Sequence, residues 1–424
     1  MSSTASPTTA RTAPDAARAQ RRILTVLVSA QILSGAGLAA GITVGALLAQ
    51  DILGSTGLAG LPSGLFTAGS AVAAIAVGRL SQRRGRRPGL AAGYLTGALG
   101  SLGVIAAAVL DNPPLLFAAL FVYGAGTATN LQARYAGADL ATASHRGRAV
   151  STVLVATTLG GVVGPNLAAP TGALAETLGI PHLAGPFLLA ALAYALAALV
   201  LAVWLRPDPL LLARALGDTG TPAASGTAPE PDRTEGSEKG VAVGGLVMAL
   251  TQLVMVAIMT MTPVHMHDHG HGTAAAGLVI AIHVAAMYLP SPLTGWLVDR
   301  HGRLPVAAAS GVTLLAAGAL AAAAPADSVV LLAAALALLG LGWNLGLVAG
   351  TAIITDTVPL ATRAKTQGAV DVSIALAGAT GGMGSGLLVA AASYPVLALA
   401  GGLLAVAVVP LAALANRPRA EKTR

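Results

Sequence analysis

The segment Gly78-Arg-Leu-Ser-Gln-Arg-Arg-Gly-Arg-Arg87 has a second copy, Gly295-Trp-Leu-Val-Asp-Arg-His-Gly-Arg303, at an offset of 217 residues. The same offset relates a second block, in which Asp139, Arg146 and Arg148 align with Asp356, Arg363 and Lys365. Because one offset fits both blocks, we predict that the chain consists of two halves with the same topology. The glycines permit a tight turn and a close approach of helices, so each copy is expected to connect two helices.

Conserved spacing within the two copies defines the candidate gate residues, which are Gly78, Gln82, Arg83, Gly85 and Arg86 in the first copy and Gly295, Asp299, Arg300, Gly302 and Arg303 in the second. An Asp can face a helix N-terminus, and an Arg can bridge to acidic groups in a closed gate. Gln82 stands where the second copy has Asp299, so the first latch has no charge at this position. Asp139 and Asp356 end predicted helices beside Arg146, Arg148, Arg363 and Lys365, and we expect ion pairs there.

The composition indicates a chain that lies mostly in lipid. Of the 424 residues, 55% are hydrophobic and 10% are charged, whereas soluble domains carry about 25% charged residues. Apolar stretches of roughly 20 residues, enough to cross a bilayer, recur along the chain, and runs such as 311–324 are apolar on every face, unlike strands of a membrane barrel. We predict an all-α membrane protein with twelve helices, at 22–49, 58–80, 89–110, 113–137, 147–170, 184–205, 241–264, 273–297, 304–325, 328–352, 365–391 and 393–415.

These helices divide the chain into five parts. Residues 1–21 are polar and are expected to form a disordered cytoplasmic tail, and 22–205 form the first six-helix half. Residues 206–240 are rich in Pro, Thr, Ser, Gly and charge, which predicts a flexible cytoplasmic linker. The second half spans 241–415, and 416–424 form a second cytoplasmic tail.

Charge sets the expected orientation and partners. With the first helix running outward, all 24 Lys and Arg lie on the cytoplasmic side, as the positive-inside rule requires for a protein of the plasma membrane. The net charge of +7 then reflects topology and contact with anionic lipids, not nucleic-acid binding. There is no Cys, which excludes thiolate metal sites and disulfides. We find no nucleophile or phosphate-binding loop, so we do not expect an enzyme. We also expect a monomer.

The two copies resemble the loop signature Gly-x-Leu-x-Asp-Arg-x-Gly-Arg of the major facilitator superfamily, between helices 2 and 3 and again between helices 8 and 9. The resemblance spans nearly the whole chain. It implies two six-helix halves around a membrane-normal axis, a substrate site between them near the midplane, and alternating access.

Methionine and histidine gather in one predicted hairpin, helices 7 and 8 with their loop, which holds six of the eight Met and five of the eight His. Met255 and Met259 are four residues apart on one helix, as are His283 and Met287 on the next, so each pair shares a helix face. Thioethers favour Cu(I), and imidazole also binds copper. Met255 and His283 lie about 14 and 15 Å from the extracellular ends, at ~1.5 Å per residue. The pairs therefore predict a copper site near mid-membrane.

The two pairs resemble the signature of the CcoA-like (CalT) copper importers, a branch of the major facilitator superfamily, with Met-x-x-x-Met on helix 7 and His-x-x-x-Met on helix 8. The resemblance implies uptake of a copper ion or a small copper chelate, held by Met255, Met259, His283 and Met287. Copper is then the transported substrate, and no cofactor is expected. Some relatives in this branch are thought to carry other solutes such as riboflavin.

The predicted outer loop reads His265-Met-His-Asp-His-Gly-His271. Alternating histidines can converge in a flexible loop to capture a metal. The candidate capture residues are His265, His267, His269, His271, Met261, Met266 and Asp268. A solvated turn or a pH-sensitive gate fits the same residues.

Several further residues leave the transport chemistry open. Asp371, in the predicted eleventh helix near Gln367, is a candidate proton site or gate partner. Polar residues that face either the cavity or a neighbouring helix are Asn130, Gln132, Arg134 and Asn344. The segment Gly160-Gly-Val-Val-Gly-Pro165 partly resembles the Gly-Pro motif of proton-coupled drug antiporters and also suits a hinge. The alternatives to copper import are therefore proton-coupled transport of an organic solute, and a metal receptor that does not transport.

Overall fold

The computed structural model describes residues 13–53, 61–218 and 233–415. Residues 1–12 and 416–424 of the predicted tails and 219–232 of the predicted linker therefore lie outside the described residues. The described chain is helical, with no strand. Its helices are α1 (Ala13–Leu53), α2 (Leu61–Arg84), α3 (Arg86–Val109), α4 (Pro113–Ala138), η1 (Ala143–His145), α5 (Arg146–Asn166), α6 (Ala168–Thr177), η2 (His182–Ala184), α7 (Gly185–Trp204), α8 (Pro209–Asp218), α9 (Arg233–Asp268), α10 (Thr273–Tyr288), α11 (Ser291–His301), α12 (Arg303–Ala323), α13 (Val329–Thr357), α14 (Arg363–Ala391), α15 (Tyr394–Ala405) and α16 (Val408–Ala415).

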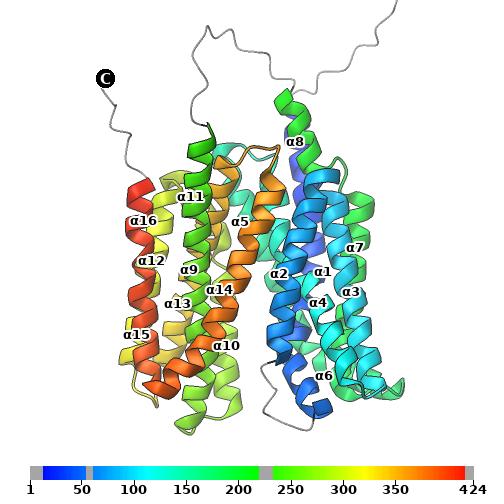
Figure 1. The fold of residues 1–424 in the computed structure, drawn as a ribbon, viewed down its shortest axis with the longest axis vertical. Helices are drawn as coiled ribbons and strands as arrows, with labels where there is room; N and C mark the ends of the chain where they lie inside the picture. The colour runs from blue at the N-terminus through cyan, green and yellow to red at the C-terminus, as the bar shows by residue number, and fades with distance from the viewer. Residues whose placement is uncertain (1–12, 54–60, 219–232, 416–424) are drawn as a thin grey trace, which may run out of the picture.

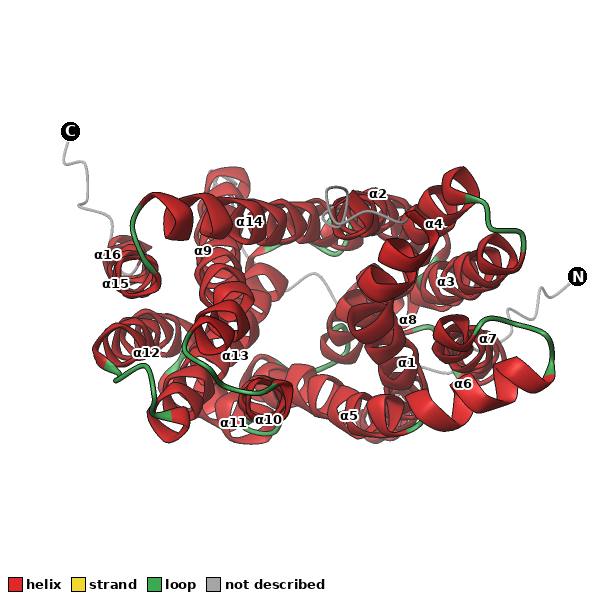
Figure 2. Ribbon diagram, turned by 90° about the horizontal axis from the view of Figure 1, so that it is seen from below, coloured by secondary structure: helices red, strands yellow, loops and turns green. Residues whose placement is uncertain are grey.

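The helices form two bundles that stand side by side (Figure 1). One bundle contains α1 to α7, and the other contains α9 to α16. Each has a buried apolar core, largely made of Ala, Leu and Val, and the core of the second bundle also includes Ala138, Val150 and Leu154 of α4 and α5. Seen along the bundles, α14 lies beside α2 and α11 lies beside α5, and these two pairs carry most of the packing between the halves (Figure 2).

Ten helical segments of the described chain are long and apolar enough to cross a membrane. They correspond to ten of the twelve predicted helices. The first and fifth predicted helices are present as α1 and α5, which include residues whose side chains are not described. The predicted eighth helix is broken between Tyr288 and Ser291 into α10 and α11, where Pro290 provides no N–H for a continuous helix.

Three segments differ from the predicted tail and linker, one of them the start of α9, which begins at Arg233 inside the predicted linker. Helix α1 begins at Ala13, so the second part of the predicted disordered tail is helical. Helix α8 occupies 209–218 inside the predicted flexible linker. Asp208 fixes this helix, because its carboxylate accepts hydrogen bonds from the backbone N–H groups of Leu210 and Leu211 and also, at 2.7 Å, from that of Arg87 at the start of α3.

Glycines of the two motif copies form tight turns and allow helices of the two halves to pack closely. Gly85 and Gly302 have φ of 98° and 94°, a conformation that other residues rarely adopt, and they form the turns α2–α3 and α11–α12. We call the end of the molecule with these two turns the basic end. Gly78 packs against the backbone of Gly368 on α14, and Gly295 packs against Ser151 on α5. A Cβ at either glycine would overlap the partner helix, so these residues let the halves meet closely.

Candidate transport site and gate

Helix α13 positions the two predicted ligands on α10. The Nδ1 of His283 lies 2.8 Å from the carbonyl oxygen of Leu336. Gly340 lets the helices approach, because a Cβ there would overlap the backbone of His283. Asn344 donates hydrogen bonds of 2.7 Å to the Met287 carbonyl and to the Ser291 hydroxyl, which bridges the break between α10 and α11. Both ligand-bearing turns are thus held by backbone contacts.

His283 has one ring nitrogen available as a ligand. A carbonyl oxygen only accepts hydrogen bonds, so Nδ1 must carry the proton and Nε2 of the neutral ring has a free lone pair. This Nε2 is buried and has no hydrogen-bond partner among the described residues. A histidine that binds a metal through one nitrogen usually donates from the other to a carbonyl or carboxylate, which fixes the ring. The geometry of His283 fits that pattern.

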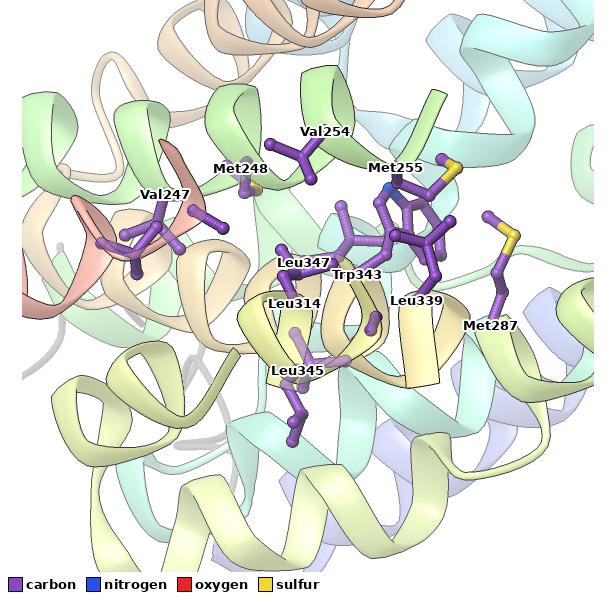
Figure 3. Close-up of a cluster of buried hydrophobic side chains, with 14 of the residues drawn as sticks. Val247, Met248, Val254, Met255, Met287, Leu314, Leu339, Trp343, Leu345 and Leu347 are labelled. Atoms are coloured by element: carbon purple, nitrogen blue, oxygen red, sulfur yellow. The ribbon is translucent and has the colours of Figure 1, made fainter. Parts of the chain in front are cut away.

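The methionines of the quartet gather in one part of the second half. Met255 and Met287 are 3% and 8% exposed and belong to one buried cluster. Figure 3 shows their side chains extending from facing helices toward the same space beside Trp343. Met287 lies one helical turn from His283, and Met259 lies one turn from Met255 and packs against the same cluster. The quartet therefore comes from one region of the second half.

An aromatic and amide group that sequence reasoning missed borders the same cluster. The indole Nε1 of Trp343 donates a 2.7 Å hydrogen bond to Oε1 of Gln252. The ring of Tyr288 meets Trp343 edge to face, with ring centroids 5.7 Å apart. Only the periodicity of α9 and α13 could have indicated that these residues share one space.

The predicted outer histidine loop is wrong in its conformation, because α9 continues to Asp268. His265 stacks on Tyr394, and His269 lies beside it with its Nδ1 2.8 Å from the His265 carbonyl. His271 instead contacts the Ala326 carbonyl, while His267 and Asp268 are exposed. Met261 and Met266 pack into the apolar core. No three His, Asp or Glu side chains of the described residues come together as a metal site.

Hydrogen bonds from the motif copies hold the halves together at the basic end. Gln82 accepts from the N–H groups of Ala364 and Lys365 and donates to the carbonyls of Leu360 and Ala361. Asp299 of the second copy accepts from the N–H groups that begin α5, at 2.8 and 3.0 Å. The neutral Gln82 therefore caps α14 as the charged Asp299 caps α5.

Ion pairs repeat with the same symmetry. Arg86 pairs with Asp139 at 2.8 Å, fully buried, and Arg303 pairs with Asp356 at 2.7 Å. The acidic partners were predicted correctly, but we expected the basic partners downstream of them. Of those, Arg146 pairs with Asp356 of the other half instead of with Asp139, which precedes it in the sequence. The remaining motif arginines are peripheral: Arg83 is exposed, and Arg300 lies over the Trp296 ring.

One further ion pair crosses between the halves. Arg134 on α4 donates a 2.7 Å hydrogen bond to Oδ1 of Asp371 on α14, and the hydroxyl of Tyr135 lies 3.2 Å from the same oxygen. Asn130 and Gln132 of α4 bond to Ser34 and the Ala74 carbonyl within the first half. Asn130 and Gln132 therefore stabilise the packing of the first half, whereas Arg134 and Asp371 form an ion pair between the halves.

The family model of the Major Facilitator Superfamily matches residues 27–233 and 243–424 of this chain. The chain belongs to this superfamily. Its members are transporters, so this facilitator is a multi-pass membrane transporter.

Similar proteins agree on the family and differ in what they name as substrate. This facilitator is 56% identical to the uncharacterized MFS-type transporter YdeG of Bacillus subtilis (strain 168), over 92% of this chain and 91% of that protein. It is 34% identical to the riboflavin transporter RfnT of Brucella anthropi, over 84% and 86%. The solved structure of the human organic anion transporter MFSD10 (TETRAN) has a TM-score of 0.74 at 16% identity, over 93% and 99%, which shows the shared fold. None of these three is named for copper.

Proposed function

We propose that this facilitator imports copper across the plasma membrane by alternating access. The observation that carries the proposal is the buried Nε2 of His283, which has no hydrogen-bond partner among the described residues while Nδ1 contacts the Leu336 carbonyl. Met287 lies one helical turn away, and Met255 belongs to the same buried cluster as Met287. An orphaned buried acceptor costs stability, about 1–3 kcal/mol. A cation bound at this nitrogen would offset that cost.

The donor set favours Cu(I) among the metals. Thioether sulfur and neutral imidazole are soft or intermediate ligands, whereas carboxylate and carbonyl oxygens suit Mg²⁺ and Ca²⁺. Met255, Met259, His283 and Met287 carry no negative charge, which keeps binding reversible, as transport requires. A small copper chelate would use the same donors.

The closed basic end fits the cargo-accepting state of an importer. If the Arg-rich turns face the cytoplasm, as the positive-inside rule predicts, the latches of Gln82 and Asp299 close the cytoplasmic side. Cargo then reaches the site from outside, and opening of the latches delivers it to the cytoplasm. This orientation places both chain termini in the cytoplasm.

A second candidate is uptake of a planar organic solute such as riboflavin. Trp343 and Tyr288 offer aromatic faces and Gln252 an amide beside the same cluster, and rings of this kind stack on aromatic ligands. The 34% identity to the riboflavin transporter RfnT supports this alternative.

The test compares radioactive copper uptake by cells that express the wild type or a variant. Met255→Leu and Met287→Leu conserve volume and remove sulfur, and His283→Leu removes the free nitrogen. The matched control is Met383→Leu, because Met383 is 70% exposed on α14. We expect at least about a tenfold loss of uptake for the three site variants, which corresponds to ~1.4 kcal/mol, and none for the control.

Riboflavin uptake is measured in the same cells. Copper uptake that survives in Met255→Leu and His283→Leu contradicts the proposal. Riboflavin uptake that is lost in Trp343→Leu but retained in Met255→Leu would establish the second candidate instead. Surface labelling of each variant excludes loss of the protein from the membrane as the cause.

A further inference from the structure

The polar contacts at the basic end are of two kinds, and the 217-residue offset separates them. The Arg86–Asp139 pair becomes Arg303–Asp356 when the offset is applied, and each pair spans 53 residues. The offset also relates the two capping residues, because Gln82 corresponds to Asp299. We therefore assign the contacts that the offset repeats to the symmetric scaffold of the basic end.

The Arg134–Asp371 pair has no counterpart. Applying the offset to Arg134 gives Thr351, and applying it in reverse to Asp371 gives Leu154. The pair is also more deeply buried than the other ion pair described between the halves: its side chains are 0% and 2% exposed, whereas Arg146 is 19% and its partner Asp356 27% exposed. A buried ion pair contributes little net stability compared with apolar residues. Its presence outside the symmetric scaffold therefore points to a role in transport.

One carboxylate oxygen of Asp371 accepts no hydrogen bond from the described residues. Both donors, Arg134 and Tyr135, bind Oδ1, while Oδ2 is buried without a partner among the described residues. A proton on Oδ2 would neutralise the carboxylate without displacing either donor. Arg134 would keep its hydrogen bonds to Thr351 and to the Leu131 carbonyl and its contact with the Tyr135 ring.

Few other charges face this carboxylate. On the same helix, Gln367 lies one turn earlier and accepts a hydrogen bond from Arg86 of α3. Apart from α4, which carries Arg134 and Tyr135, the helices packed against α14 carry their described charged or titratable side chains near their ends: Arg79, Arg83 and Arg84 on α2, Glu238, Lys239, His265, His267 and Asp268 on α9, and Tyr394 on α15. Arg134 is therefore the main electrostatic partner of Asp371.

We propose that Asp371 is the proton-binding site that couples transport to a proton gradient. In the closed state its carboxylate attracts Arg134 across the two halves. Binding of one proton at Oδ2 gives the neutral acid, removes this attraction and lets the basic end open; release of the proton restores the ion pair. The proposal uses only the transporter fold and does not depend on copper as the cargo.

The test measures opening of the basic end directly. Because the chain has no Cys, a single Ser151→Cys substitution gives one reactive thiol. Ser151 is 1% exposed, packs against Gly295 of the other half, and its hydroxyl has no partner, so the substitution removes no hydrogen bond of the described structure. The rate of maleimide labelling of the purified protein, normalised to that of the denatured protein at each pH, reports opening.

We expect labelling of Ser151→Cys to increase as the pH falls. Adding Asp371→Asn, which mimics the protonated acid, should raise labelling about tenfold at neutral pH, equivalent to ~1.4 kcal/mol, and abolish the pH response. The matched control is Asp356→Asn, which weakens a symmetric latch. It should raise labelling and keep the pH response. A pH response that persists in Asp371→Asn, or is lost in Asp356→Asn, overturns the proposal.

A second variant keeps the test decisive if Asp371→Asn does not fold. Tyr135→Phe removes only the hydroxyl that stabilises the charged carboxylate. The pH at which labelling increases should then move upward, and an unchanged profile contradicts the proposal. Since labelling needs no cargo, failure here is distinct from failure of the copper assignment, which is decided by uptake.

Discussion

Gln82 is the residue for which sequence and structure give opposite expectations. The sequence suggests a weak first latch, because a neutral amide replaces the carboxylate of Asp299. In the structure the amide forms four hydrogen bonds across the halves, donated to Leu360 and Ala361 at 3.2 and 2.5 Å and accepted from Ala364 and Lys365 at 2.7 and 3.3 Å. Replacement by Ala removes all four.

The magnitude follows from the number and exposure of these bonds. A net hydrogen bond contributes about 0.5–1.5 kcal/mol, and the lower figure suits a partly exposed site. Gln82→Ala should therefore destabilise the closed basic end by about 2 kcal/mol, which shifts the equilibrium toward opening about 30-fold, at tenfold per ~1.4 kcal/mol. The bonds exist only while the halves meet, so the effect falls on the closed state.

Maleimide labelling of Ser151→Cys measures this shift. Gln82→Ala should accelerate labelling about 30-fold, and Asp299→Ala, which removes the cap of α5, should have a comparable effect. The control is Arg83→Ala, since this neighbouring side chain is exposed. If Asp299→Ala accelerates labelling and Gln82→Ala labels like Arg83→Ala, the amide does not hold the gate and the reasoning is refuted.

Two further predictions concern the site and the fold. Asn344→Leu removes the hydrogen bonds to the Met287 carbonyl and to Ser291, so copper binding to the purified protein should weaken about tenfold, as expected for loss of a residue that orients a ligand; unchanged affinity contradicts a positioning role. Gly69→Val should prevent α2 from packing on the α4 backbone and abolish a monodisperse peak in size-exclusion chromatography, whereas Gly64→Val, with open space at its Cβ, should behave like the wild type.

The fold was predictable because its signals are local or repeated. Apolar length identifies membrane helices without knowledge of tertiary contacts, and the single offset of 217 residues predicts the two halves. The same offset relates the two ion pairs, because Arg86–Asp139 and Arg303–Asp356 have the same separation in sequence. Arg86 and Arg303 were predicted as gate residues, but Asp139 and Asp356 were expected to pair with the basic residues that follow them in the sequence.

The candidate site was predictable only in part. Spacing of four on a helix indicated the Met and His pairs, but not the Leu336 carbonyl that orients His283, since a backbone partner leaves no trace in a sequence. The outer histidines show the opposite error. Residues two apart in a helix point to different faces, so the alternating pattern converges only if the segment is a loop, and α9 covers its first four residues, up to Asp268. The Arg134–Asp371 pair joins helices 237 residues apart in the chain, which no single sequence can reveal.

Asymmetry connects the two functional assignments. The residues that correspond by offset to Met255, Met259, His283 and Met287 in the first half are Leu38, Ile42, Phe66 and Ser70, none of which binds copper through sulfur or imidazole. Like Asp371, the quartet belongs to the second half alone. Helix α14, which carries Asp371, packs directly against α9, and Gly381 lets its backbone contact that of Leu253, two residues before Met255. Under the two proposals, a movement of α14 on release of Arg134 would pass through this contact to α9, which carries two of the proposed copper ligands, while the latches open between the halves.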